Sequence, residues 1–152
     1  MTTTFEEILE QDGQLMYRNV GDSMMPLLRQ NKDLMIITRK TGKRLSVMDV
    51  PLFKRKDGKY ILHRVIWVRK NDYIICGDNQ WYPERGVTDS QILGVLTAVV
   101  RNGKRIEASS LGMRCYSLAQ WLLYPARAAA LCMARNIWPR LKRIFARSNG
   151  KK

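Results

Sequence analysis

At residues 21–28 the chain reads Gly-Asp-Ser-Met-Met-Pro-Leu-Leu, and its only histidine is His63. A serine hydroxyl is a weak nucleophile until a neighbouring base removes its proton. Histidine suits that role because an unperturbed imidazole changes its charge near neutral pH. We therefore interpret Ser23, in a turn that follows a glycine, as a candidate nucleophile and His63 as the candidate base that activates it.

Further segments extend this pair into an ordered pattern. They are Asp-Val-Pro-Leu-Phe at 49–53, Tyr-Ile-Leu-His-Arg-Val-Ile at 60–66, Gly-Asp-Asn at 77–79 and Ile-Leu-Gly-Val at 92–95. In this order and spacing, the segments resemble the type I signal peptidases and their relatives, the self-cleaving SOS-type repressors. The resemblance covers about residues 5–100. Several segments in one order are a more specific signal than the serine segment alone.

The branches of that family differ in the residue that serves as the catalytic base, and this chain resembles one of the branches. Most bacterial signal peptidases and the repressors pair serine with lysine, whereas the endoplasmic-reticulum-like branch pairs serine with histidine and a carboxylate. The resemblance implies a serine endopeptidase in which Ser23 attacks the scissile carbonyl, His63 passes the proton to the leaving amine, and water hydrolyses the acyl-enzyme. It also implies that the residues after the serine contact the substrate, namely Met24, Met25 and Pro26.

Three acidic residues are candidates for the carboxylate that supports His63. Asp78 belongs to the Gly-Asp-Asn segment and is our first choice. The eukaryotic branch has a further aspartate six residues later, followed by Arg-Gly, and this chain has Glu84 at that position. Glutamate is one methylene longer than aspartate, so Glu84 ranks second. Asp89 ranks third.

The substrate that the resemblance implies is a precursor peptide or preprotein, bound in extended form against a strand edge and cut after small residues. The alternative is a catalytically idle or self-processing regulator that keeps the β fold as a binding module, with its basic tail on nucleic acid or a partner. We prefer the peptidase because a self-cleaving repressor would carry lysine in place of His63. We expect no metal or other cofactor, since the three cysteines lack metal-ligand spacing.

Apolar and β-branched runs separated by turn signals predict a mainly β fold. The expected strands are residues 15–20, 34–38, 50–54, 60–68, 73–76 and 93–100. A short N-terminal helix is predicted by the capping box of Thr4 and Glu7, with Gly13 at its end. We expect a signal-peptidase-like antiparallel β domain over residues 1–107 and a helical basic tail over residues 108–152.

The tail combines positive charge with apolar side chains. Residues 101–152 contain 12 lysines and arginines and one acidic residue, against 15 and 12 in residues 1–100. The apolar residues between the charges argue against nucleic acid, and the arginines argue against a transmembrane span. We predict an amphipathic helix on an anionic membrane surface, with these residues in contact: Trp121, Leu122, Leu131, Trp138, Arg127 and Arg135.

The alternative for the tail is that it packs on the β core of the same chain or on a second copy. The oligomeric state is left open. The first residues, Met-Thr-Thr-Thr-Phe-Glu-Glu, lack the basic and apolar character of an export signal. We therefore expect a cytoplasmic protein that is peripherally associated with the membrane.

Overall fold

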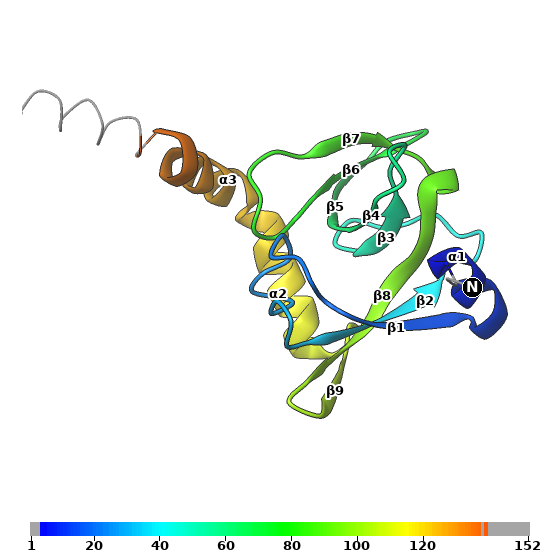
Figure 1. Cartoon of the computed structure of the whole chain (residues 1–152). Coiled ribbons are helices and arrows are strands. Elements are labelled where there is room, and N and C mark those ends of the chain that lie inside the picture. The colour runs from blue at the N-terminus through cyan, green and yellow to red at the C-terminus, as the bar shows by residue number, and fades with distance from the viewer. Residues whose placement is uncertain (1–3, 138, 140–152) are drawn as a thin grey trace, which may run out of the picture.

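The computed structural model describes residues 4–137 and residue 139, which form a curled antiparallel β-sheet with helices at both ends (Figure 1). Helix α1 (Phe5–Asp12) precedes the strands. The strands are β1 (Gln14–Arg18), β2 (Leu34–Arg39), β3 (Pro51–Lys54), β4 (Tyr60–Leu62), β5 (Arg64–Val68), β6 (Tyr73–Cys76), β7 (Glu84–Val87), β8 (Ile92–Arg101) and β9 (Lys104–Glu107). The remaining elements are η1 (Asp89–Gln91), α2 (Leu111–Leu122), α3 (Tyr124–Cys132) and η2 (Met133–Ile137).

The strands form two sheets with antiparallel neighbours. The larger sheet has the order β1-β2-β8-β3-β4, and β9 pairs with β8 beyond this path. Within the described residues, β1, β4 and β9 each pair with a single strand, so all three are edges of this sheet. The smaller sheet has the order β5-β6-β7. Side chains along β8 alternate between buried and half-buried, as they do when one face of a strand packs against a core.

Two apolar clusters fill the molecule. One includes Leu9 of α1 and Leu15 of β1, and Tyr116 of α2 packs against it. The other joins the two sheets, with Phe53 of the larger sheet and Tyr73 of the smaller sheet both fully buried. The candidate site described below lies on loops and strand ends that these two clusters hold in place.

The predicted antiparallel β fold is confirmed, and so is the N-terminal helix. The hydroxyl of Thr4 accepts the N–H of Glu7, and the carboxylate of Glu7 accepts the N–H of Thr4, which completes the capping box. Helix α1 ends at Gly13, whose φ of 70° is the left-handed conformation that favours glycine.

The single strand predicted at 60–68 is instead two strands in different sheets. β4 belongs to the larger sheet and β5 to the smaller one, and His63 is the residue between them. Apolar residues continue through both strands, so the sequence pattern does not mark the crossover. Sequence analysis also missed β7 and β9, because these four-residue strands contain charged residues, such as Glu84 and Glu107, and only one β-branched residue each.

The helical tail packs partly on the β domain. The indole N–H of Trp121 donates to the carbonyl of Ile66 at 3.0 Å, and the hydroxyl of Tyr116 donates to the carboxylate of Asp78 at 2.9 Å. None of the helices in the described part of the chain has the length and apolar character needed to cross a membrane. Packing on the protein's own core, the alternative to lipid contact, therefore accounts for part of this tail.

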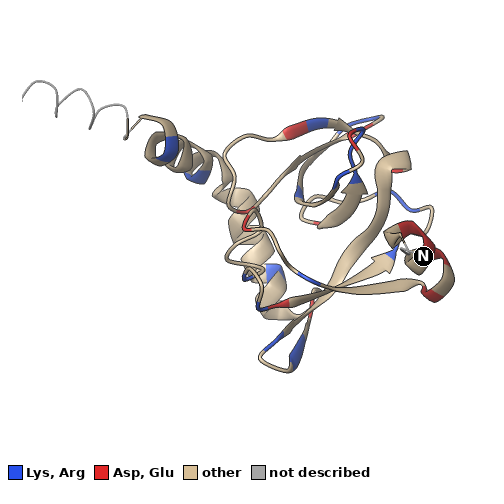
Figure 2. Ribbon diagram, in the orientation of Figure 1, with Lys and Arg blue, Asp and Glu red and all other residues tan. Residues whose placement is uncertain are grey.

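The residues predicted to contact lipid divide into three groups. Trp121 and Arg127 donate to backbone carbonyls of the β domain, so their polar groups point at the protein. Leu122 and Arg135 are exposed, and Leu131 is half-buried. Trp138 lies outside the described residues. Figure 2 shows basic residues on the β9 hairpin and on the C-terminal helices.

Candidate active site

Ser23 lies in a turn between β1 and β2. The N–H of Met25 donates to the carbonyl of Asp22, and the N–H of Leu28 donates to that of Met24, each at 3.0 Å. Met24 is buried, with 1% of its surface exposed, whereas Ser23 is half-buried and lines a groove. The buried methionine thus anchors the turn, and the serine next to it stays accessible.

A second loop, residues 77–80 after β6, lies directly behind this turn. The backbone N–H of Asn79 donates to the carbonyl of Ser23 at 2.8 Å, and its side-chain amide donates to the carbonyl of Asp22 at 3.1 Å. A Cβ atom on Gly77 would lie 2.6 Å from the Ser23 carbonyl oxygen, so a larger residue would push the two loops apart. The Gly-Asp-Asn segment therefore positions the backbone of the candidate nucleophile.

His63 is almost completely buried at the crossover between the sheets, with 2% of its surface exposed. Its ring meets the ring of Phe53 edge-on, with centroids 6.4 Å apart. Nδ1 lies 3.0 Å from Glu84 Oε1 but is not aligned for a hydrogen bond. Catalytic hydrogen bonds are often poorly aligned without substrate and tighten when it binds. Because Nδ1 faces Glu84, Nε2 is the nitrogen left to accept a proton from a nucleophile.

Glu84, at the start of β7, is held between two partners. Arg55 donates from Nε to Oε2 at 2.7 Å and also binds Oε1. Burial raises the pKa of Glu84, but its interactions with His63 and Arg55 outweigh burial and lower that pKa from 4.5 to about 2. Glu84 is therefore an anion at neutral pH, which suits a group that orients an imidazole and stabilises its protonated form.

Sequence analysis did not single out Arg55. It stands among several basic residues near the β3–β4 hairpin, where charged side chains are usually solvated. The pairing of β6 with β7 places Glu84 opposite Ile75, and the tertiary fold then brings Arg55 against its carboxylate. No local pattern in the sequence joins two residues from separate sheets.

Asp78 has a different partner, which reverses the expected order of the carboxylates. Arg64 donates to both carboxylate oxygens, from Nε and Nη2, each at 2.8 Å, and Asp78 is 3% exposed. Consecutive residues of an extended chain point to opposite sides. His63 therefore meets Glu84 on one side, and Arg64 meets Asp78 on the other.

The third-ranked carboxylate belongs to another cluster. Asp89 accepts the hydroxyl of Tyr73 at 2.7 Å and pairs with Lys40 at 3.1 Å. Of the three acidic residues, Glu84 is the one that the structure places beside His63.

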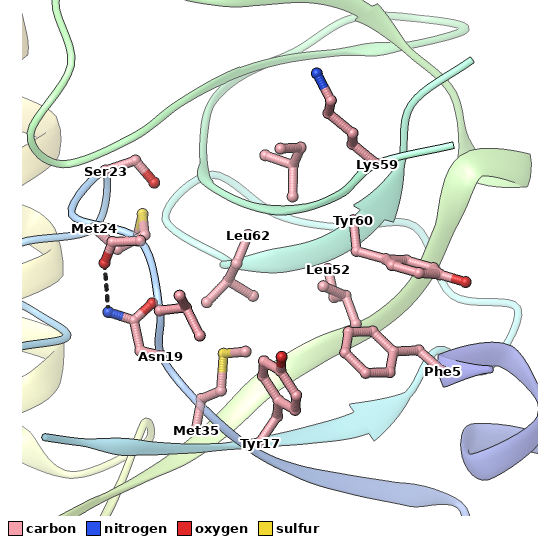
Figure 3. Close-up of a pocket in the computed structure, with 13 residues that line it drawn as sticks. Phe5, Tyr17, Asn19, Ser23, Met24, Met35, Leu52, Lys59, Tyr60 and Leu62 are labelled. Carbon is pink, nitrogen blue, oxygen red and sulfur yellow. Dashed lines mark hydrogen bonds between the residues drawn. The ribbon is translucent and has the colours of Figure 1, made fainter. Parts of the chain in front are cut away.

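A groove of about 450 Å³ lies beside Ser23. Residues of β1 and β4, both edge strands of the larger sheet, line it together with Ser23 and α1. Ser23 lies at one end of the groove and Phe5 at the other (Figure 3). Of the three predicted substrate contacts, Met24 lines the groove, whereas Met25 and Pro26 are exposed outside it.

Ser23 lines the groove itself, whereas His63 is buried and is not among the residues that line it. Leu62, the residue before His63, lines the groove with Ser23. No hydrogen bond joins the Ser23 hydroxyl to His63 within the part of the chain that the structure describes. The N–H groups of Ser23 and Met24 likewise donate to no acceptor in this part.

Comparisons with protein families, with curated proteins and with solved structures find no match for this chain. Within residues 4–137 and 139, no group of three or more His, Cys, Asp or Glu side chains is placed to hold a metal ion. The site combines an accessible serine, a buried histidine that faces an anion, and a groove that connects the serine to solvent.

Proposed function

We propose that this protein is a serine endopeptidase of the signal peptidase type, which cleaves leader or signal segments from precursor peptides or preproteins. The observation that carries the proposal is the carboxylate of Glu84, 3.0 Å from Nδ1 of the only histidine, which directly follows Leu62 of the groove that Ser23 lines. An imidazole held by an anion on one nitrogen is suited to accept a serine proton on the other.

In the proposed reaction, His63 Nε2 takes the proton of the Ser23 hydroxyl as the oxygen attacks the scissile carbonyl. The N–H groups of Ser23 and Met24 stabilise the resulting oxyanion, and Glu84 stabilises the imidazolium. The imidazolium then donates its proton to the leaving amine. A water molecule, deprotonated by the neutral imidazole, hydrolyses the acyl-enzyme and restores Ser23.

The groove favours an extended peptide as substrate. Edge strands present unpaired N–H and C=O groups that can add a further strand, and β1 and β4 are the edges that line the groove. Its walls carry apolar side chains, with Met35, Leu52 and Leu62 among them. We therefore expect a substrate segment with apolar residues on the side that faces the larger sheet.

The peptidase proposal is tested with purified protein and peptides that carry an apolar stretch followed by small residues. We expect a single cut in a subset of these peptides, read by mass spectrometry. A rate that rises only above about pH 8 would indicate a lysine base, and complete absence of cleavage would favour a non-catalytic binding module.

We further propose that the C-terminal helices place the enzyme on an anionic membrane surface. Trp67, Leu122 and Leu123 are each about 60% exposed. Two of them, Trp67 and Leu122, line an apolar groove of about 420 Å³ between the smaller sheet and the tail. The excess of positive charge in residues 101–152 matches an anionic headgroup layer.

The membrane proposal predicts salt-sensitive binding to vesicles of phosphatidylglycerol and phosphatidylcholine. Replacing both Leu122 and Leu123 by serine should lower the affinity at least about tenfold, because apolar burial in lipid is lost. The matched control is Leu111→Ser, which changes an exposed leucine at the start of α2. Equal binding to vesicles of phosphatidylcholine alone, or no binding at low salt, would contradict the proposal.

A further inference from the structure

The C-terminal tail binds the loop of residues 77–80, which lies behind the candidate nucleophile Ser23. Arg127 of α3 directs Nη1 at three carbonyl oxygens of residues 77–80: those of Gly77 at 3.4 Å, Gln80 at 3.2 Å and Asp78. Its guanidinium also lies 5.5 Å from the ring centroid of Tyr124. Carbonyl dipoles that converge on one point repel one another, so the cation allows the loop to keep this conformation.

Helix α2 contacts a side chain of the same loop. The hydroxyl of Tyr116 donates to Asp78 Oδ2 at 2.9 Å. Arg64, which binds the same carboxylate, donates from Nη1 to the hydroxyl of Ser117 at 2.8 Å. Both helices of the tail therefore contact the Gly-Asp-Asn segment. Helix α3 contacts the backbone of the segment, and α2 contacts the carboxylate of Asp78.

The same loop contacts the backbone of Ser23. The N–H of Asn79 holds the carbonyl of Ser23 at 2.8 Å, and Gly77 packs against the same oxygen. The chain of contacts thus runs from Arg127 through residues 77–80 to the backbone of the candidate nucleophile. Along the chain, α3 is separated from this loop by a long segment that includes β7, β8 and α2.

We propose that Arg127 is a positioning residue for Ser23, which makes the C-terminal helices a part of the catalytic unit. This inference rests on the proposed peptidase function for its effect on turnover, but its structural part is independent of that function. Without the guanidinium, the carbonyls of residues 77–80 separate, Asn79 loosens its hold on Ser23, and the hydroxyl leaves the line of attack. Substrate binding along the groove is not expected to change, since Arg127 does not line it.

The first test measures hydrogen exchange of the backbone amides in the full-length protein. In Arg127→Gln, the amide of Asn79 and those of residues 22–25 should exchange about tenfold faster or more, because charge-assisted hydrogen bonds that hold the loop are lost. The matched control is Arg114→Gln, which removes one exposed positive charge from α2. Unchanged exchange at Asn79 in Arg127→Gln would overturn the inference.

The second test separates turnover from substrate binding. With a cleaved peptide, Arg127→Gln should lower kcat roughly 10- to 100-fold at nearly constant KM, as displacement of a reacting group does. Arg127→Lys, which keeps the cation, should recover part of this loss and serves as the test variant if Arg127→Gln does not fold. An equal loss in Arg114→Gln, or a change confined to KM, would refute the positioning role. If the wild type cleaves nothing, the peptidase proposal fails while the exchange experiment still decides the contact.

Discussion

Replacing Ser23 by alanine is expected to abolish peptide cleavage, with a loss in kcat on the order of 10⁶-fold, as found when a nucleophilic serine is removed from other serine peptidases. His63→Ala should cause a similar loss, because the nucleophile and its base act in one step. The double variant should be no worse than either single variant. Steady-state kinetics with a cleaved peptide, followed by mass spectrometry, measures all three.

The matched control for this experiment is Ser109→Ala, which removes an exposed hydroxyl that lies away from the groove. Cleavage by this variant should equal that of the wild type. Thermal unfolding should also show that Ser23→Ala is folded, since the Ser23 side chain makes no hydrogen bond in the described part of the chain. Substantial cleavage by either Ser23→Ala or His63→Ala would rule out the proposed pair.

Glu84→Gln is expected to lower kcat by roughly 10³- to 10⁴-fold, the range found when the aspartate of a serine peptidase triad becomes an amide. The neutral amide no longer stabilises the imidazolium that forms as Ser23 attacks. Asp78→Asn should act mainly on folding, because it leaves Arg64 buried without its full counter-charge and costs about 3–5 kcal/mol. Kinetics and thermal unfolding of the two variants distinguish these effects.

Glu10→Gln, on the exposed surface of α1, is the control for Glu84→Gln and should change neither quantity. If Asp78→Asn instead lost turnover at full stability while Glu84→Gln remained active, the carboxylate would be Asp78 and the structural assignment would fail. The two variants therefore decide between the carboxylate that sequence analysis preferred and the one that the structure places beside His63.

The Glu84 pairing also predicts how stability varies with pH. The pKa of Glu84 is about 2 in the folded protein, below its ordinary value of 4.5. Its contribution is therefore fully present above about pH 5 and is lost as the pH falls from there toward pH 2. The melting temperature should fall over this range, and the fall should be smaller in Glu84→Gln. An identical pH dependence in the two proteins would show that Glu84 is not stabilised in this way.

Local sequence patterns were enough for the β class, the first helix and the candidate nucleophile and base. Strands such as β2 and β8 follow from apolar and β-branched runs, and α1 follows from its capping box, because both signals depend on residues close together in the chain. Ser23 and His63 were found from ordered segments of the sequence, His63 also as the only histidine. The strands and the helix depend on a few consecutive residues, and the candidate pair depends on the order of several short segments.

The sequence left the partner of each buried charge undetermined. Asp78 and Glu84 are both acidic residues that follow His63 in the chain. The sequence around them does not show which of the two carboxylates lies beside the imidazole ring. The choice depends on which side of the chain each residue faces where it passes from β4 to β5. His63 and Arg64 face opposite sides there, so they receive different carboxylates.

The role of the tail was decided by tertiary structure for the same reason. Its charge and apolar content suggested lipid, and they fit the exposed Leu122 and Leu123. The same composition does not show that Arg127 binds the loop behind Ser23, since that contact joins residues about fifty positions apart in the chain. Composition shows how many charged side chains the tail contains. Only the folded chain brings the carbonyls of residues 77–80 close together and places the guanidinium of Arg127 against them.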